Sequence, residues 1–145
     1  METTVSLVQM LDARERRVQH QQALLAQYHK PLICFTMNIC GPVKDSPLIR
    51  RGFARGCQLL RQQFLRAKLV PLREDAIREV TGCEAFYVLD ADPLTIKKFT
   101  TDIEDATPLG RLFDMDVIRP DGRKVDREEL HLSLIHISEP TRRVV

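Results

Sequence analysis

The stretch PLICFTMNICGPVKDSPLIRRGF, residues 31–53, sets a nearly continuous apolar run directly before a turn and the start of a helix. Its first nine residues, 31–39, are rich in strand formers, which predicts a buried strand. A glycine and a proline then mark a turn, and Asp45 or Ser46 before Pro47 is a typical helix N-cap with proline in the first turn. The stretch therefore predicts a strand, a loop and a helix in immediate succession.

The predicted helix carries apolar residues at every third or fourth position, namely Ile49, Phe53, Cys57, Leu60 and Phe64. It also contains Gly52 and Gly56, each of which costs about 1 kcal/mol relative to alanine inside a helix. Both glycines lie on one flank of the apolar stripe. We therefore expect a backbone or a ligand to pack closely against that flank.

The rest of the chain alternates between helical and strand patterns. We predict a long helix over residues 5–28 capped by Thr3 or Thr4, strands at 68–72, 85–89 and 112–118, a helix from Asp92, and a hairpin turn at 119–123. Residues 73–83 fit either a helical turn or one arm of a hairpin. This order predicts a single α+β domain, with one mixed or antiparallel sheet packed against helices.

The composition excludes several classes of protein. The four cysteines, Cys34, Cys40, Cys57 and Cys83, are irregularly spaced without a CxxC pair, which favours reduced thiols over a zinc site or disulfides. No apolar stretch approaches the roughly 20 residues that cross a bilayer, and the N-terminus lacks a basic region followed by a hydrophobic one. We therefore expect a cytoplasmic protein with no membrane partner.

Charge is unevenly distributed along the chain. Residues 44–73 hold eight lysines and arginines and one aspartate, whereas residues 74–126 hold thirteen acidic and seven basic residues. This pattern suits a protein that binds an anion with one segment and a cation with another, although a solvated surface gives the same counts. The basic segment has no recognition motif and no interleaved aromatic residues, so we expect no nucleic-acid partner.

A candidate metal site lies in GRLFDMDV, residues 110–117. Side chains two apart in a strand point to the same face, so Asp114 and Asp116 project together, about 6 to 7 Å apart, opposite the apolar residues between and beside them. Two carboxylates at that separation repel each other, and a nearby cation would offset the repulsion. Mg²⁺ suits this role, because it binds one or two carboxylates and completes its coordination with water and phosphate oxygens. The solvated face of an edge strand would explain the same tripeptide.

A candidate phosphate site is formed by GPVKDS, residues 41–46, between the buried strand and the helix. Unpaired N–H groups and a partial positive charge at such a junction favour a bound phosphate, which places Gly41, Lys44 and Ser46 among the candidate substrate-binding residues. A turn followed by an N-cap explains the sequence equally well. Arg111, directly before the strand that carries Asp114 and Asp116, could hold a phosphate bidentately.

The segments MLDARERRVQHQ (residues 10–21), PLICFTMNICGPVKDSPLIRRGFARG (31–56) and TPLGRLFDMDVIRPDG (107–122) resemble the citrate lyase holo-acyl-carrier-protein synthase family. This family is also called apo-citrate lyase phosphoribosyl-dephospho-CoA transferase, and the likeness runs from about residue 7 to about residue 130. The combination of the GP-hydrophobic-KDS and PLGR-aromatic-D-hydrophobic-D motifs, in that order, is specific.

The resemblance implies an enzyme that transfers a phosphoribosyl-dephospho-CoA unit from triphosphoribosyl-dephospho-CoA to a serine of the citrate lyase acyl carrier subunit, releasing pyrophosphate. It also implies nucleotidyltransferase-type chemistry and, by analogy, a nucleotidyltransferase-like fold. We then expect Asp114 and Asp116 to hold Mg²⁺, Arg111 to act with them in catalysis, and Lys44, Arg50, Arg51, Arg14, Arg17 and Gln21 to hold substrate. A non-catalytic module that binds the nucleotide or the carrier protein is the alternative.

The likeness to the family ends near residue 130. The last fifteen residues, 131–145, read HLSLIHISEPTRRVV, and SLIHISEPTRR resembles translated sequencing adapter. We therefore expect a C-terminally truncated transferase domain over residues 1–130, followed by an aberrant tail over residues 131–145.

Overall fold

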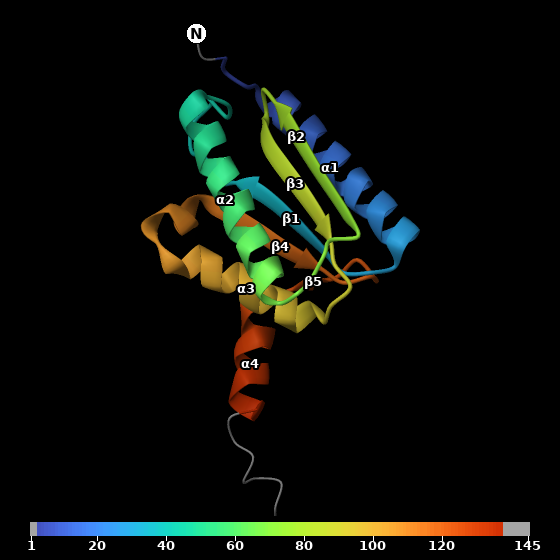
Figure 1. Ribbon diagram of the computed structural model, residues 1–145. Coiled ribbons are helices and arrows are strands. Elements are labelled where there is room, and N and C mark those ends of the chain that lie inside the picture. The colour runs from blue at the N-terminus through green and yellow to red at the C-terminus, as the bar shows by residue number, and fades with distance from the viewer. Residues whose placement is uncertain (1–2, 138–145) are drawn as a thin grey trace, which may run out of the picture.

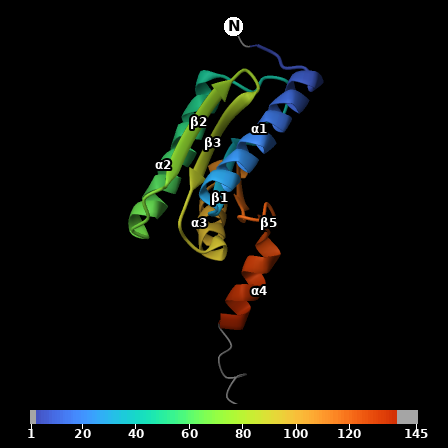
Figure 2. The ribbon, with the colours of Figure 1, turned by 90° about the vertical axis from the view of Figure 1, so that its right-hand side faces the viewer.

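The computed structural model describes residues 3–137 as an antiparallel sheet with helices on both faces (Figures 1 and 2). Its elements are α1 (Leu7–Tyr28), β1 (Leu32–Met37), α2 (Pro47–Arg66), β2 (Arg73–Glu79), β3 (Gly82–Val88), α3 (Pro93–Ala106), the 3-10 helix η1 (Pro108–Leu112), β4 (Phe113–Ile118), β5 (Lys124–Val125) and α4 (Arg127–Ile137). The predicted α+β class is confirmed, and the predicted strand–loop–helix succession corresponds to β1, residues 38–46 and α2.

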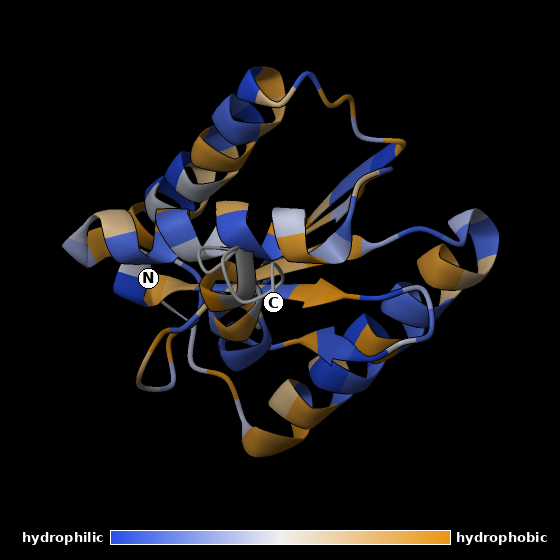
Figure 3. Ribbon diagram, turned by 90° about the horizontal axis from the view of Figure 1, so that it is seen from below, coloured by the Kyte–Doolittle hydropathy of each residue, from blue (hydrophilic) through white to orange (hydrophobic). Residues whose placement is uncertain are grey.

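The sheet has the strand order β2-β3-β1-β4-β5, and every neighbouring pair is antiparallel. β1 is the central strand, because it pairs with β3 on one side and β4 on the other. Figure 2 shows α1 on one face of the sheet and α2 on the other. Figure 3 shows that hydrophilic and hydrophobic residues alternate along the helices. This is expected for helices that pack one face against a sheet and expose the other to solvent.

The larger core lies between the sheet and helices α2 and α3. Phe35 of β1 is fully buried there and stacks on Phe53 of α2 with ring centroids 5.0 Å apart. A Cβ added to Gly56 would lie 2.4 Å from the Phe35 ring, whereas one added to Gly52 would lie 3.1 Å from the end of the Met37 side chain. Close packing against this flank of α2 is therefore confirmed, but the contacts come from the Phe35 and Met37 side chains of β1 and not from a backbone or a ligand.

The smaller core lies under α1, where Leu24 and Leu25 pack on Leu32 of β1. α1 begins at a capping box in which the Ser6 hydroxyl accepts the Gln9 N–H and the Gln9 side chain accepts the Ser6 N–H. The cap predicted at Thr3 or Thr4 was thus wrong by two or three residues, because Gln9 supplies the reciprocal hydrogen bond at the third helical position.

The region after α2 differs from the prediction. No strand forms at residues 68–72, and the ambiguous segment instead forms β2, one arm of a hairpin with β3. β2 alternates between exposed and half-buried residues, because it lies at the edge of the sheet and α1 covers only one of its faces. The predicted turn at residues 119–123 is confirmed by a hydrogen bond from the Arg119 N–H to the Arg123 carbonyl.

At the C-terminal end, α4 packs on α3 and extends away from the rest of the molecule (Figure 1). It crosses the boundary predicted at residue 130, so the described part of the predicted tail is helical; residues 138–145 lie outside the described residues. No helix in residues 3–137 is both long enough and apolar enough to span a membrane.

Candidate functional site

The two aspartates of β4 lie on the α1 face of the sheet. Phe113, Met115 and Val117 are buried in the larger core, whereas Asp114 is exposed and Asp116 is half-buried. The predicted alternation along this strand is confirmed. At Asp114 and Asp116, β4 pairs with β1 on one side, whereas β5 pairs only with Val117 and Ile118. Within residues 3–137, β4 is therefore an edge strand at the two aspartates.

Strand pairing places further polar residues beside these aspartates. Thr36 of β1 is opposite both Asp114 of β4 and Glu84 of β3, which makes a polar row across the three central strands. In the next row Cys34 lies between Asp116 and Phe86. One end of the α1 face is therefore polar.

The Asp114 and Asp116 carboxyls interact directly. Reduced hydration and then the nearby Asp116 carboxylate raise the pKa of Asp114, even though the residue is exposed. The Lys124 ammonium lies 3.1 Å from the Asp116 carboxylate and offsets part of the negative charge. The pair thus has the electrostatic character that a bound cation would relieve.

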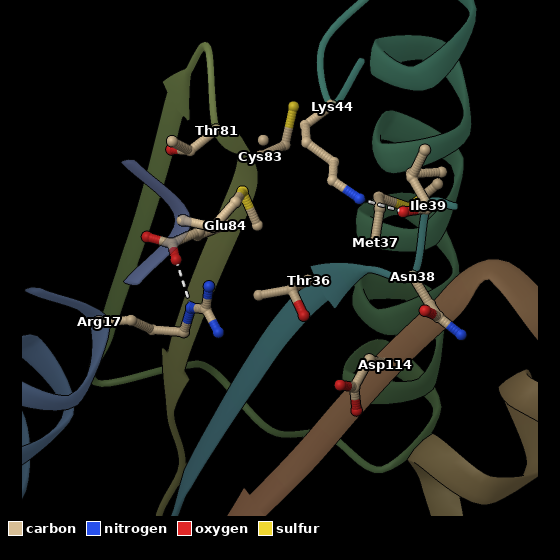
Figure 4. Close-up of a pocket in the computed structure, with 12 residues that line it drawn as sticks. Arg17, Thr36, Met37, Asn38, Ile39, Lys44, Thr81, Cys83, Glu84 and Asp114 are labelled. Carbon is tan, nitrogen blue, oxygen red and sulfur yellow. Dashed lines mark hydrogen bonds and ion pairs between the residues drawn. The ribbon is translucent and has the colours of Figure 1, made fainter. Parts of the chain in front are cut away.

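A cavity of about 210 Å³ opens beside Asp114 and is drawn in Figure 4. Three of the predicted residues line it, each from a different element: Arg17 from α1, Lys44 from the loop before α2, and Asp114 from β4. Figure 4 shows Thr36 between Arg17 on one side and Asp114 on the other. Two cationic side chains and two carboxylates, those of Asp114 and Glu84, therefore line one opening.

The cations are held by polar contacts. The Arg17 guanidinium donates to the Glu84 carboxylate, and the Lys44 ammonium donates to the Ile39 carbonyl. An ammonium has three N–H donors, and no carboxylate among residues 3–137 pairs with Lys44. The remaining N–H donors of Lys44 are therefore available to an anion in the cavity.

A second polar layer lies beneath Arg17. His20 is 2.9 Å from Asp75 of β2 and packs its ring on Phe86, and Gln21 hydrogen-bonds the Cys34 thiol. Burial raises the pKa of Cys34 to about 12, so the thiol is neutral and is no candidate nucleophile. All four cysteines are free thiols, as the spacing predicted; three of them are buried, and Cys40 is exposed.

Several predicted residues do not line this cavity. Gly41 is exposed in its loop with φ of 86°, Ser46 caps α2 by accepting the Ile49 N–H at 3.1 Å, and Arg50 donates two hydrogen bonds of 2.8 Å to Asp45. Arg14 and Arg111 are exposed, and Arg51 lines a different hollow. The substrate contacts predicted for these residues stay predictions.

Four polar residues that line the cavity were not predicted from the sequence, namely Thr36, Asn38, Thr81 and Glu84. Thr36 and Asn38 were read as part of an apolar strand. Glu84 lies directly after the segment 73–83, which fits either a helical turn or one arm of a hairpin. The signal that would have found Glu84 is the pairing of β1 with β3, which places Glu84 opposite Thr36, 48 positions away.

The donor set around the aspartates fits Mg²⁺. The structure contains no cluster of three or more His, Cys, Asp or Glu side chains within residues 3–137 that could hold a metal ion. Two carboxylates on one face nevertheless suffice for Mg²⁺, which keeps several waters and takes its other ligands from substrate phosphates. The adjoining cavity, with Lys44 and Arg17, provides room for those phosphates.

Comparison with known proteins identifies close relatives. The family model described as Apo-citrate lyase phosphoribosyl-dephospho-CoA transferase matches residues 5–134. A protein of that name from Citrobacter koseri is 34% identical over 139 residues, which cover 96% of this chain and 72% of the relative. Another of that name from Escherichia coli O1:K1 is 33% identical over 128 residues, covering 88% of this chain and 70% of the relative.

One relative is much longer than this chain. Protein CitXG from Haemophilus influenzae is 34% identical over 129 residues, which cover 89% of this chain and 28% of that protein.

Proposed function

Because the chain belongs to the apo-citrate lyase phosphoribosyl-dephospho-CoA transferase family, we propose that it attaches the phosphoribosyl-dephospho-CoA group to a serine of the citrate lyase acyl carrier subunit. The observation that carries this proposal is the meeting of Arg17, Lys44 and Asp114 around one cavity. A polyanionic substrate needs cationic side chains to bind it, and a metal ion that acts on its phosphates needs a carboxylate close by.

The donor in this reaction is triphosphoribosyl-dephospho-CoA. The serine Oγ attacks the α-phosphorus, a new P–O bond forms to the carrier subunit, and the bond from the α-phosphorus to the α–β bridging oxygen breaks. The serine hydroxyl loses its proton, and pyrophosphate leaves with the bridging oxygen. Negative charge grows on the phosphoryl oxygens and on pyrophosphate, so fixed positive groups at these positions lower the barrier.

Residues of this chain supply such groups. Lys44 has free N–H donors at the cavity, and Arg17 is held at the opposite side by Glu84. These two side chains would bind and orient the triphosphate. Arg111, exposed in η1 directly before β4, is the candidate for a further phosphate contact.

Asp114 and Asp116 are the residues that would hold Mg²⁺ in this proposal. When bound, the ion would neutralise phosphate oxygens and help to stabilise the charge that develops on the leaving group. The raised pKa of Asp114 supports this role, because a carboxyl with a nearby like charge gains from a cation.

The test is to incubate the purified chain with apo carrier subunit, triphosphoribosyl-dephospho-CoA and Mg²⁺, and to measure the mass of the carrier and the release of pyrophosphate. We expect one prosthetic-group mass added per carrier, an equal amount of pyrophosphate, and loss of both with EDTA. A shift in carrier mobility without a change in mass would show a binding module and contradict the proposal.

A further inference from the structure

An apolar hollow lies next to the polar cavity, between the first turns of α2 and helix η1. Its volume is about 530 Å³. We call it the apolar hollow, and its lining consists of Met37, Ile39, Leu48, Ile49, Gly52, Leu109, Leu112, Arg51 and Arg55. Leu48 is 72% exposed and Leu112 is 39% exposed. Clustered exposed leucines at a hollow are typical of a surface that binds another molecule.

Two arginines border the apolar hollow, and neither is neutralised. Within residues 3–137 no carboxylate pairs with Arg51 or Arg55, and Arg55 donates only to the amide of Gln58 on its own helix. By contrast Arg50 and Arg61, on the same helix, are paired with Asp45 and Glu74. The border of the apolar hollow is therefore a place where acidic side chains of a partner would be attracted.

The apolar hollow and the polar cavity share two lining residues. Met37 and Ile39, at the end of β1 and just after it, line both of them, and Figure 4 shows these two residues beside Lys44. A molecule seated in the apolar hollow is therefore only one side chain away from the phosphate-binding cavity.

We propose that the apolar hollow is the docking site of the carrier subunit, which seats an amphipathic, acidic segment there and passes its acceptor serine over Met37 and Ile39 into the cavity. The inference rests on the proposed function, since it assigns the protein substrate of that reaction. Apolar side chains of the segment contact Leu48 and Leu112, and its carboxylates pair with Arg51 and Arg55.

The nature of the lining separates the two substrates. The triphosphate donor needs cations and N–H donors, which the cavity supplies through Arg17 and Lys44. The apolar hollow has leucine and isoleucine side chains as its main lining, which suit the apolar contacts of a protein. Arg51, predicted from the sequence to hold substrate, is thereby assigned to the protein acceptor instead of the phosphates.

The first experiment compares Leu48→Ser with Leu65→Ser. Both residues are exposed leucines of α2, 72% and 76% accessible, but Leu65 lies at the far end of the helix from the apolar hollow. We expect Leu48→Ser to raise the KM for carrier about tenfold, as for a central interface side chain, and to leave the KM for the donor unchanged. Leu65→Ser should match the wild type in both.

The second experiment reverses charge, comparing Arg55→Glu with Arg66→Glu further along α2. Arg55→Glu should weaken carrier binding, measured by calorimetry with the apo subunit, by about tenfold or more, with a smaller effect at high salt. Arg66→Glu changes net charge equally and should bind like the wild type. Arg51→Glu should likewise raise the carrier KM and spare the donor KM.

The outcomes separate the two proposals. A wild-type chain that adds no mass to the carrier contradicts the proposed function, whatever the variants do. Normal transfer by the wild type, with an unchanged carrier KM in both Leu48→Ser and Arg55→Glu, overturns the docking site alone. A rise in donor KM instead of carrier KM would assign the apolar hollow to the nucleotide, and self-association that Leu48→Ser abolishes would assign it to a second copy.

Discussion

The three central strands carry opposite chemistry at the two ends of their α1 face. At one end Leu32 of β1 lies between Val88 and Ile118, and all three are almost fully buried. Four residues further along β1, Thr36 lies between Glu84 and Asp114, with a cavity beside it. The backbone pairing is the same at both ends, so the difference is set by side chains alone.

This difference separates the parts of the sheet that stabilise the fold from those that serve the site. Apolar side chains under a helix stabilise it by leaving water, at about 25 cal/mol per Å². The like-charged aspartates of β4 give no such gain, and the raised pKa of Asp114 shows that its ionised form is disfavoured there. Substitutions at the polar end should therefore change transfer activity, and those at the apolar end should change stability.

The largest effect is expected for Asp114→Asn. It removes one of two carboxylates proposed to hold Mg²⁺, and we expect the transfer rate to fall about 10³-fold. The free energy of unfolding should not decrease, because the substitution removes a charge that the fold disfavours. Steady-state pyrophosphate release and urea denaturation measure the two quantities. Asp121→Asn, in the exposed turn before β5, is the control for the transfer rate and should leave that rate unchanged.

At the apolar end, Leu32→Ala should lower the free energy of unfolding by about 3 kcal/mol, because it leaves a cavity in a fully buried position. Chemical denaturation with a probe of secondary structure measures this change. Leu65→Ala, at an exposed position, should cost almost nothing. A folded Leu32→Ala protein should retain the wild-type transfer rate at low temperature; a loss of rate comparable to that of Asp114→Asn would abolish the distinction between the two ends.

Arg17→Gln tests the cation on the α1 side of the cavity. It should reduce kcat/KM for the donor about 30-fold, equivalent to about 2 kcal/mol, because a charged contact to phosphate is lost. Arg16→Gln is the neighbouring control, since Arg16 pairs with Glu79 in solvent, and its kcat/KM should stay within twofold of the wild type. Equal losses in both variants would show a general effect of charge on α1.

The smallest effect concerns Asp75, beneath the site. Burial alone would raise the pKa of Asp75, but hydrogen bonds from Arg73 and His20 outweigh it and lower the pKa below its ordinary value. The stabilisation is then present above the unfolded pKa near 4 and is lost as pH falls through the folded value. Between pH 5 and pH 3, the free energy of unfolding of the wild type should fall further than that of Asp75→Asn, by up to about 1 kcal/mol. Denaturant titration at each pH measures both values. Parallel pH curves would contradict this.

Local patterns were enough to predict much of this fold. The apolar run at residues 31–39 became β1, the Ser46–Pro47 cap began α2, and alternation along β4 turned Asp114 and Asp116 away from the core. Each of these depends on residues within one turn or one strand, so the sequence specifies it directly.

The rest depends on contacts between distant segments. Glu84 meets Arg17 only because β3 pairs with β1 and α1 crosses both strands, and no pattern near residue 84 indicates either fact. Likewise, the arginine-rich start of α2 did not reveal that Arg50 is paired with Asp45 while Arg51 borders an apolar hollow. A run of charge predicts a binding segment but not which of its side chains are free.

The central claim is that the polar end of the α1 face binds a metal ion together with phosphates. The most direct test is to titrate isotope-labelled protein with Mn²⁺ and inorganic pyrophosphate and to follow the broadening of backbone amide signals. We predict that the signals of Thr36, Asp114 and Asp116 broaden first, and that Asp114→Asn greatly weakens the effect. Broadening centred on another acidic group, such as Asp102 and Asp105 on α3, with these three signals unchanged would contradict the claim.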